Sequence, residues 1–308
     1  MLSGPSVAKA MEGKHRSVLL HEALELLAIT SDDVVVDATL GGAGHSQAIA
    51  AKLGKDGVLI GIDADHDAIL RGKELLKGVA PTVRLIEANF RDVSAQLEKL
   101  GIPEVDKMLF DLGWSSFQLD AGRGFSLKSD EPLLMTYSKD PGALTAQTIV
   151  NEWAEESIAD VIFGWGEERY SRRIAKAIVE RRESKPFTTA RELAETIYAN
   201  VPPRYRFGKI HPATRTFQAL RIAVNDELGA LAQGLRDGWQ KLSKGGRIAV
   251  ISFHSIEDRV VKQTFKQWEE SGQGKRVTKK PLMPSPTEIA ENPRSRSAKL
   301  RVIEKLND

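Results

Sequence analysis

The chain has 308 residues, 41% of them hydrophobic, which is enough for one large soluble domain or two ordinary ones. It contains no cysteine, so disulfides, iron–sulfur clusters, Cys-ligated zinc and cysteine nucleophiles are excluded. A formal net charge of +2 argues neither for nor against a nucleic-acid partner. The N-terminus has no apolar core of signal-peptide length, and no stretch of about 18 apolar residues occurs, so we expect a cytoplasmic protein without membrane contact.

Strand-like and helix-like segments alternate through the first third of the chain. Strands are expected at residues 33–39, 58–63, 82–88 and 105–111. An Ala-rich helix, a helix from about Asp67 and a short third helix are expected between them. Such alternation is typical of βαβ units with a parallel sheet.

The pattern changes from about Ala121. A Gly/Ser/Pro-rich loop precedes two amphipathic helical stretches, at 157–184 and 188–202, and the second has capping-box spacing at Thr189 and Glu192. A helix over 214–242 follows, with a break near Asn225 and an end at Gly245–Gly246.

The last part of the chain returns to strands. They are expected at 247–253 and 300–306, on either side of a helix at 256–268. The sequence thus predicts a discontinuous α/β domain of residues 15–120 and 212–308, with a helical insert domain at 121–211 that serves substrate recognition.

The first strand leads into a glycine-rich loop, DATLGGAGHS, at residues 37–46. An acid, glycines and a helix N-terminus in this order indicate a ligand site at the carboxyl edge of a parallel sheet. A dinucleotide fingerprint starting at Gly42 fails because Gln47 stands where its third glycine belongs, and a phosphate loop fails because no lysine follows. S-adenosylmethionine suits the loop better, because it has no phosphate and needs close backbone approach.

The following strand ends carry residues that fit the same cofactor. Asp63 is placed to accept the ribose hydroxyls, Phe90 to lie against adenine, and Asp111 ends the fourth strand. Taken singly, a strand-ending aspartate is more often a cap or turn residue, and a phenylalanine more often belongs to the core. Together these strand ends favour a methyltransferase.

Several longer motifs resemble one family. DATLGGAGHS, DLGWSSFQLD, HPATRTFQALRIAVNDEL, GGRIAVISFHSIEDRVVK and NPRSRSAKLR occur in the order and spacing of the bacterial small-subunit (16S) ribosomal RNA cytosine-N4 methyltransferase H family. The resemblance runs from His15 to about Arg301. It implies a class I (Rossmann-like) S-adenosylmethionine-dependent methyltransferase fold, a role in rRNA processing, and methylation of a cytosine N4 in the decoding region.

The resemblance also implies site residues. Cofactor contacts are expected at Gly41, Ala43, Gly44, His45, Asp63, Phe90, Asp111 and Gln118. The family commonly has glycine where Ala43 stands, a modest change for a backbone contact if φ is negative. Larger departures are Trp114, where an aliphatic residue is usual, and DEPLLMT at 130–136, where the family has DGPLDMR.

The expected chemistry requires positioning, because the exocyclic amine of cytosine is a poor nucleophile. Asp111 is the candidate acceptor of the amine hydrogens, and Ser115 and His254 complete the catalytic candidates. His254 fits a structural role equally well. Cytosine C5 methylation is excluded by the absence of cysteine, and no metal site is expected because no HxxxH pair occurs.

The expected partner is 16S rRNA in the small ribosomal subunit. Residues 271–301 carry eight Lys and Arg against two Glu, which fits a solvated tail or an arm that binds RNA phosphates. A DNA amino methyltransferase and a cofactor-binding ribosome-assembly protein without turnover remain alternatives. The sequence leaves the oligomeric state open, and a homodimer is among the assemblies it allows.

Overall fold

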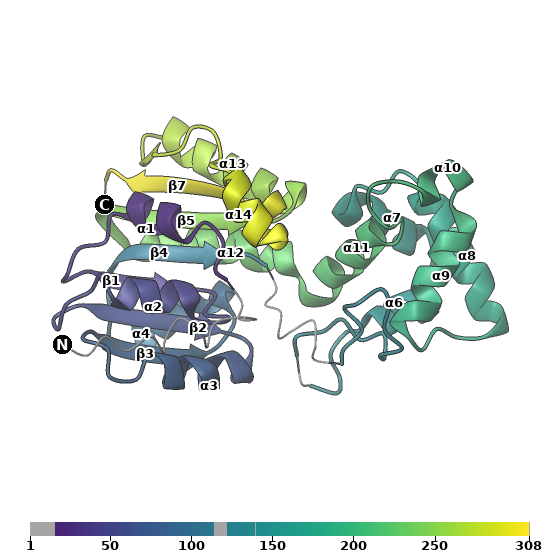
Figure 1. The fold of residues 1–308 in the computed structure, drawn as a ribbon, viewed down its shortest axis with the longest axis horizontal. Helices are drawn as coiled ribbons and strands as arrows, with labels where there is room; N and C mark the ends of the chain where they lie inside the picture. The colour runs from purple at the N-terminus through teal and green to yellow at the C-terminus, as the bar shows by residue number, and fades with distance from the viewer. Residues whose placement is uncertain (1–15, 114–121, 139, 308) are drawn as a thin grey trace, which may run out of the picture. The chain divides into compact units, whose positions relative to one another are not determined.

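The computed structural model describes residues 16–113, 122–138 and 140–307. It divides into two compact units, residues 1–115 with 233–308, and residues 116–232 (Figure 1). The first is an α/β unit and the second is helical. The chain passes from one unit to the other at 115/116 and at 232/233. The sequence predicted these domain boundaries at 120/121 and 211/212.

The α/β unit contains a seven-stranded sheet in the order β3-β2-β1-β4-β5-β7-β6 (Figure 1). The strands are β1 (Val34–Asp37), β2 (Val58–Asp63), β3 (Thr82–Glu87), β4 (Val105–Asp111), β5 (Leu242–Ser252), β6 (Gly274–Arg276) and β7 (Lys299–Lys305). Strands β1 to β5 are parallel, and β7 is antiparallel to both β5 and β6. The strand order reverses at β1, so the β1/β4 edge is where such sheets bind ligands.

Helices bury both faces of this sheet. The helices of the unit are α1 (Leu20–Leu27), α2 (Gly44–Ala50), α3 (His66–Leu75), α4 (Val93–Lys99), α13 (Ser255–Glu270) and α14 (Pro286–Glu291), with 3-10 turns η2 (Phe90–Asp92) and η3 (Pro293–Ser297). On β4, Leu109 joins the core that includes α1, α2 and α3, while Met108 and Phe110 contact Gly238 of α12 (Glu227–Lys241). Opposite faces of one strand are therefore both apolar, as a covered parallel sheet requires.

The helical unit contains α6 (Ala146–Glu152), α7 (Glu155–Gly166), α8 (Ser171–Ser184), α9 (Ala190–Asn200), α10 (Pro203–Arg206) and α11 (Thr214–Asn225). Helix α12 begins in this unit and continues into the α/β unit. The predicted capping box of Thr189 and Glu192 is confirmed at the start of α9. So is the predicted break near Asn225, because Asp226 has φ 47° and ends α11.

Two predicted helix boundaries are wrong. The helix expected over 157–184 is divided, because Glu167 has φ 50° and a Cβ at Gly166 would lie 2.6 Å from the Arg215 carbonyl oxygen. Gly245–Gly246 do not end a helix, because α12 already ends at Lys241. They lie within β5, whose pairing with β4 shifts register at this point.

The basic segment 271–301 is folded onto the α/β unit and is not a free tail. It contributes β6, α14, η3 and the start of β7. Arg301 is buried, and its guanidinium donates to both carboxylate oxygens of Asp258, at 2.7 and 3.2 Å. Arg276 pairs with Glu269. Lys299 also pairs with Asp258, at 3.1 Å. At least three of the eight basic side chains therefore serve the fold, and the buried Arg301 cannot bind a phosphate.

Among the described residues, no helix combines the length and the apolar character needed to cross a membrane.

Candidate active site

Three aspartates end adjacent parallel strands at the carboxyl edge of the sheet. Asp37 ends β1, Asp63 ends β2 and Asp111 ends β4. The chain beyond β1 stays tied to both neighbours, because the Ala38 amide donates to Leu109 at 2.8 Å and the next loop donates to β2. The parallel register thus gathers three carboxylates around the glycine loop, at the edge where sheets of this kind bind ligands.

Asp63 anchors the glycine loop through both of its carboxylate oxygens. The Gly41 amide donates to Oδ2 at 2.8 Å, and the Asp65 amide donates to Oδ1 at 2.8 Å. Burial raises the pKa of Asp63 to about 6, against these two hydrogen bonds, which lower it. The carboxylate is therefore desolvated yet fixed in place, which is a suitable state for accepting ligand hydroxyls.

Ala43 corrects an assumption made from the sequence. Alanine in place of the family's glycine costs little only where φ is negative. Ala43 instead has φ 60° and ψ 15°, in the left-handed region. Its amide donates to the Leu40 carbonyl at 2.7 Å, and its side chain is fully buried. Left-handed backbone costs a non-glycine residue about 1 kcal/mol, so this tight turn is strained at Ala43.

His45 connects the loop to Asp111. Its ring is buried in the first turn of α2, with Nε2 3.1 Å from the Val18 carbonyl oxygen and Nδ1 3.4 Å from Oδ2 of Asp111. Burial lowers the pKa of His45, but the hydrogen bond and charge of Asp111 outweigh it, so the pKa is raised. The neighbouring carboxylate of Asp111 therefore favours the protonated form of the His45 ring. The predicted cofactor contact of His45 stays a prediction.

Asp111 has one occupied and one unoccupied carboxylate oxygen. Oδ2 faces His45, whereas Oδ1 is buried and has no hydrogen-bond partner among the described residues. The backbone is held by Thr39, whose hydroxyl oxygen accepts from the Asp111 amide at 2.7 Å. A buried carboxylate oxygen without a donor is costly and is common at ligand sites.

Asp37 and Ser46 were not among the residues predicted for the site. Asp37 is buried, accepts from the Ser46 hydroxyl at 2.6 Å and from the Thr39 amide at 3.2 Å. Burial raises the pKa of Asp37, and the charge of Asp111 adds to the rise. The sequence carried a signal for Asp37, because it ends the first strand just before the glycines, but the contact with Ser46 required the folded helix.

Phe90 lies at the start of η2, directly after β3. It meets Phe110 edge to face, with ring centroids 5.8 Å apart, and a Cβ at Gly234 would lie 2.8 Å from its ring. The ring is only partly buried. It therefore belongs to the core on one side and keeps accessible area at the carboxyl edge.

Ser115 and Gln118, like Trp114, lie outside the described residues. The turn that leads to them is described as far as Gly113. A Cβ there would lie 2.9 Å from the Phe253 ring, so only glycine allows this close approach. The close packing against Phe253 therefore explains why glycine stands two residues after Asp111.

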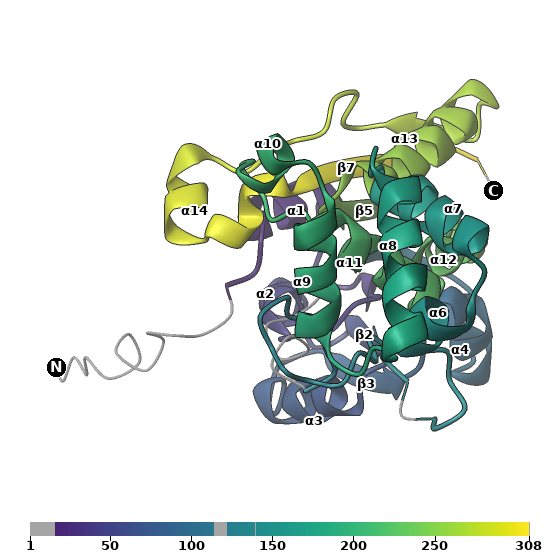
Figure 2. The ribbon, with the colours of Figure 1, turned by 90° about the vertical axis from the view of Figure 1, so that its right-hand side faces the viewer.

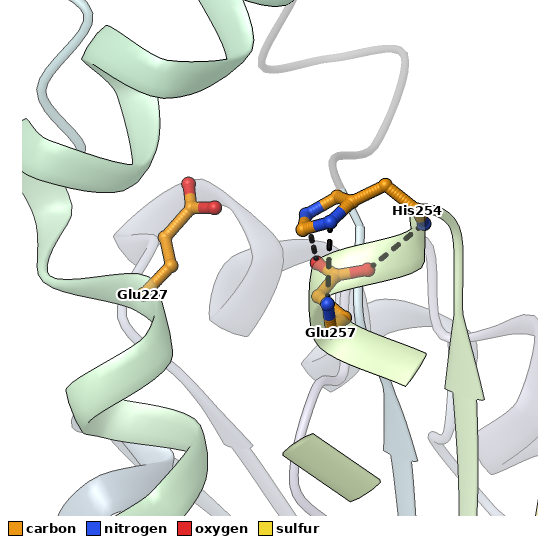
Figure 3. A group of neighbouring side chains, drawn as sticks. All are labelled: Glu227, His254 and Glu257. Carbon is orange, nitrogen blue, oxygen red and sulfur yellow. Dashed lines mark hydrogen bonds and ion pairs between the residues drawn. The ribbon is translucent and has the colours of Figure 1, made fainter. Parts of the chain in front are cut away.

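His254 caps helix α13 (Figure 3). Its Nδ1 accepts from the Glu257 amide at 3.3 Å, and its Nε2 lies 3.0 Å from Glu257 Oε1. The Glu257 carboxylate in turn accepts from the Phe253 and His254 amides. This capping box supports the structural role and leaves the catalytic role a prediction. Glu227, also drawn in Figure 3, belongs to the helical unit, where it pairs with Arg221.

The charges of the site favour a cationic ligand without phosphate. Three carboxylates lie here, those of Asp37, Asp63 and Asp111, and the charge of His45 acts on Asp37 and Asp111. The guanidinium of Arg71 lies nearby, where it pairs with Asp65 and donates to the Gly41 carbonyl. Burial raises the pKa of two of the carboxyls, so added positive charge would lower the cost of keeping them ionised. A phosphate would be repelled. A ligand with a sulfonium, an ammonium and ribose hydroxyls matches the donor set.

Comparison with known proteins agrees with this chemistry. The model of the MraW methylase family matches residues 12–306. The chain is 44% identical to the ribosomal RNA small subunit methyltransferase H of Clostridioides difficile strain 630, over 96% of this chain and 100% of that protein. It is 48% identical to the protein of that name from Coprothermobacter proteolyticus, over 95% of this chain and 96% of that protein. The solved structure of an rRNA methylase from Streptococcus thermophilus is 12% identical in sequence and aligns over 96% of this chain and 100% of its own. Its TM-score of 0.46 is too low to add to the argument.

Proposed function

The chain belongs to the MraW methylase family, and from this premise we propose that it transfers a methyl group from S-adenosylmethionine to N4 of a cytosine in the decoding region of 16S rRNA. The observation that carries the proposal is the buried Oδ1 of Asp111, at the ligand edge of a class I methyltransferase sheet, to which no described residue donates a hydrogen bond. Its relatives named above are ribosomal RNA methyltransferases, which favours RNA over the DNA alternative.

The residues present fit the cofactor. Asp63 has a lone pair left on each oxygen for the ribose hydroxyls, and Phe90 offers accessible ring area for adenine. The backbone turn at Gly41 to Gly44 permits close approach of the amino-acid part. When bound, S-adenosylmethionine supplies an electrophilic methyl group on a positively charged sulfur, and the neighbouring carboxylates are suited to that charge.

Asp111 would act on the base. Its free Oδ1 can accept a hydrogen from the exocyclic amine, which orients the nitrogen lone pair and takes up the charge that develops on the amine hydrogens. The Nδ1 atom of His45 lies 3.4 Å from the other oxygen, Oδ2, and Asp111 in turn raises the pKa of His45. Because His45 is itself held by the Val18 carbonyl, the carboxylate is fixed before the base arrives.

The proposed setting is the small ribosomal subunit in the cytoplasm. A homodimer remains a prediction. The assembly-factor alternative differs from the enzyme in one observable, because it would bind cofactor without methyl transfer.

The test is mass spectrometry of nucleosides from small-subunit rRNA of cells with and without the gene product. We expect N4-methylcytidine to depend on the protein, and to be restored by the wild-type chain but not by Asp111→Asn. Undermethylated DNA serves as the second substrate in vitro. Transfer to DNA alone, or cofactor binding with no transfer to either, would contradict the proposal.

A further inference from the structure

The segment that links α9 to α11, taken together with the first turn of α11, is basic and has no acid. Residues 202–216 contain Arg204, Arg206, Lys209 and Arg215 without a single Asp or Glu. Most of the segment is exposed, and it includes the short helix α10, which lies by the end of α9 (Figure 2). Such a composition is suited to a polyanion.

The two ends of the segment are firmly anchored within the helical unit. The Tyr205 hydroxyl donates to the buried carboxylate of Glu168, and the Tyr205 ring meets Tyr170 edge to face at 4.9 Å. Towards the other end, the His211 ring stacks on Tyr198, with centroids 5.8 Å apart. The segment is therefore a held loop, and its exposed tip is residues 207–210.

The tip exposes apolar side chains to water. Phe207 is 82% exposed and Ile210 44% exposed, with Gly208 and the exposed Lys209 between them. Within the described helical unit, nothing covers the Phe207 ring, although the chain around it is tied down. An exposed aromatic on an anchored loop is typical of a surface that binds a partner.

Basic side chains gather near this tip. Arg204 is exposed on the same segment, and the nearest acid in the anchoring contacts, Glu168, is buried and occupied by Tyr205 and by the Tyr170 amide. Burial lowers the pKa of His211, and the charge of Lys128 lowers it further, which places a second lysine near the loop. A partner with negative charge and a flat apolar surface fits this combination of basic side chains and an exposed aromatic ring.

We propose that the tip 207–210 binds the RNA substrate, with Phe207 stacked on an unpaired base and Lys209 against a neighbouring phosphate. Aromatic side chains bind single-stranded RNA in this way because every base has a stacking face, while lysine neutralises the backbone. The inference rests on the proposed function and adds to it a substrate contact in the helical unit. It also requires that the RNA be unpaired where the tip binds.

The experiment measures binding of a fluorescent single-stranded RNA with the decoding-region sequence, and of the same RNA in a duplex. Phe207→Ala should weaken single-strand binding about five-fold or more, the loss of one stacked base. Phe207→Trp should retain it. Lys209→Gln should reduce the slope of log affinity against log salt by about 0.7, one phosphate on a single strand. Phe163→Ala removes another exposed aromatic, 64% exposed on α7, and is the matched control.

Three results would overturn the inference. Binding by Phe207→Ala at the wild-type level would remove the stacking contact, and an equal loss in the Phe163→Ala control would make the effect nonspecific. Unaltered binding to RNA together with weakened binding to small ribosomal subunits would assign the tip to a ribosomal protein. Cofactor affinity is measured in parallel and should stay constant. If the wild type transfers no methyl group yet these RNA effects appear, the proposed activity fails while the contact stands.

Discussion

Replacing Asp63 by asparagine is expected to weaken cofactor binding while changing stability in a pH-dependent way. Burial raises the pKa of Asp63 from 3.8 to about 6. At about 1.4 kcal/mol per pKa unit, the ionised carboxylate costs the fold about 3 kcal/mol at neutral pH. Asparagine removes this cost. The asparagine has only one acceptor oxygen, so either the Gly41 amide or the Asp65 amide faces its NH₂ group. The lost hydrogen bond destabilises the fold by about 1–3 kcal/mol.

These terms nearly offset at neutral pH, so the pH dependence is the sharper prediction. An acid whose folded pKa is raised destabilises the fold fully above that pKa and not at all below its unfolded value. The free energy of unfolding of the wild type, relative to that of Asp63→Asn, should therefore rise by about 2 kcal/mol as the pH falls from near 7 to near 4.5. Cofactor affinity should drop by about 1.5–3 kcal/mol, because a hydrogen bond from a ribose hydroxyl to a charged group is lost.

Urea unfolding of the ligand-free proteins at both pH values, with calorimetric titration of S-adenosylmethionine, measures both effects. Asp56→Asn, at an exposed acid in the loop before β2, is the control and should change neither. If the stability difference between wild type and Asp63→Asn stayed constant with pH, the carboxylate would not be desolvated as described. Unchanged affinity would remove Asp63 from the site.

Three further predictions concern other contacts. Asp111→Asn should lower the single-turnover methylation rate by about 10²-fold at saturating cofactor and RNA, and a wild-type rate would leave Asp111 a binding residue only. Ala43→Gly should change the free energy of unfolding by less than about 1 kcal/mol, because relief of left-handed strain offsets the loss of a buried methyl, and a larger loss in urea unfolding would refute the strain. Asp258→Ala should destabilise the fold by about 3 kcal/mol, because Arg301 is left buried without its partner. Burial opposes ionisation of Asp258, but Arg301 and Lys299 outweigh it and lower its pKa. This stabilisation is therefore fully present above the unfolded pKa and is lost as the pH falls below that value and through the lowered folded pKa.

The sequence by itself determined most of the strands and the local features of the proposed site. Strands β1 to β4, the glycine loop and Asp63 were all readable because apolar periodicity, glycines and strand-ending acids are local signals. The capping box of Thr189 and Glu192 was predicted for the same reason, since both partners lie within one turn. The family resemblance, confirmed by the match over residues 12–306, added the expected cofactor and substrate.

Only the tertiary structure decided the contacts between residues far apart in the chain. From the sequence, Arg301 is one of the basic residues of the segment 271–301. In the structure it is buried and pairs with Asp258, 43 residues earlier. His45 meets the Val18 carbonyl 27 residues away, and this contact is what presents its other nitrogen to Asp111. The positive φ of Ala43 likewise depends on how the loop closes onto β2. No local pattern encodes these pairings, because packing of whole elements against one another sets which distant side chains meet.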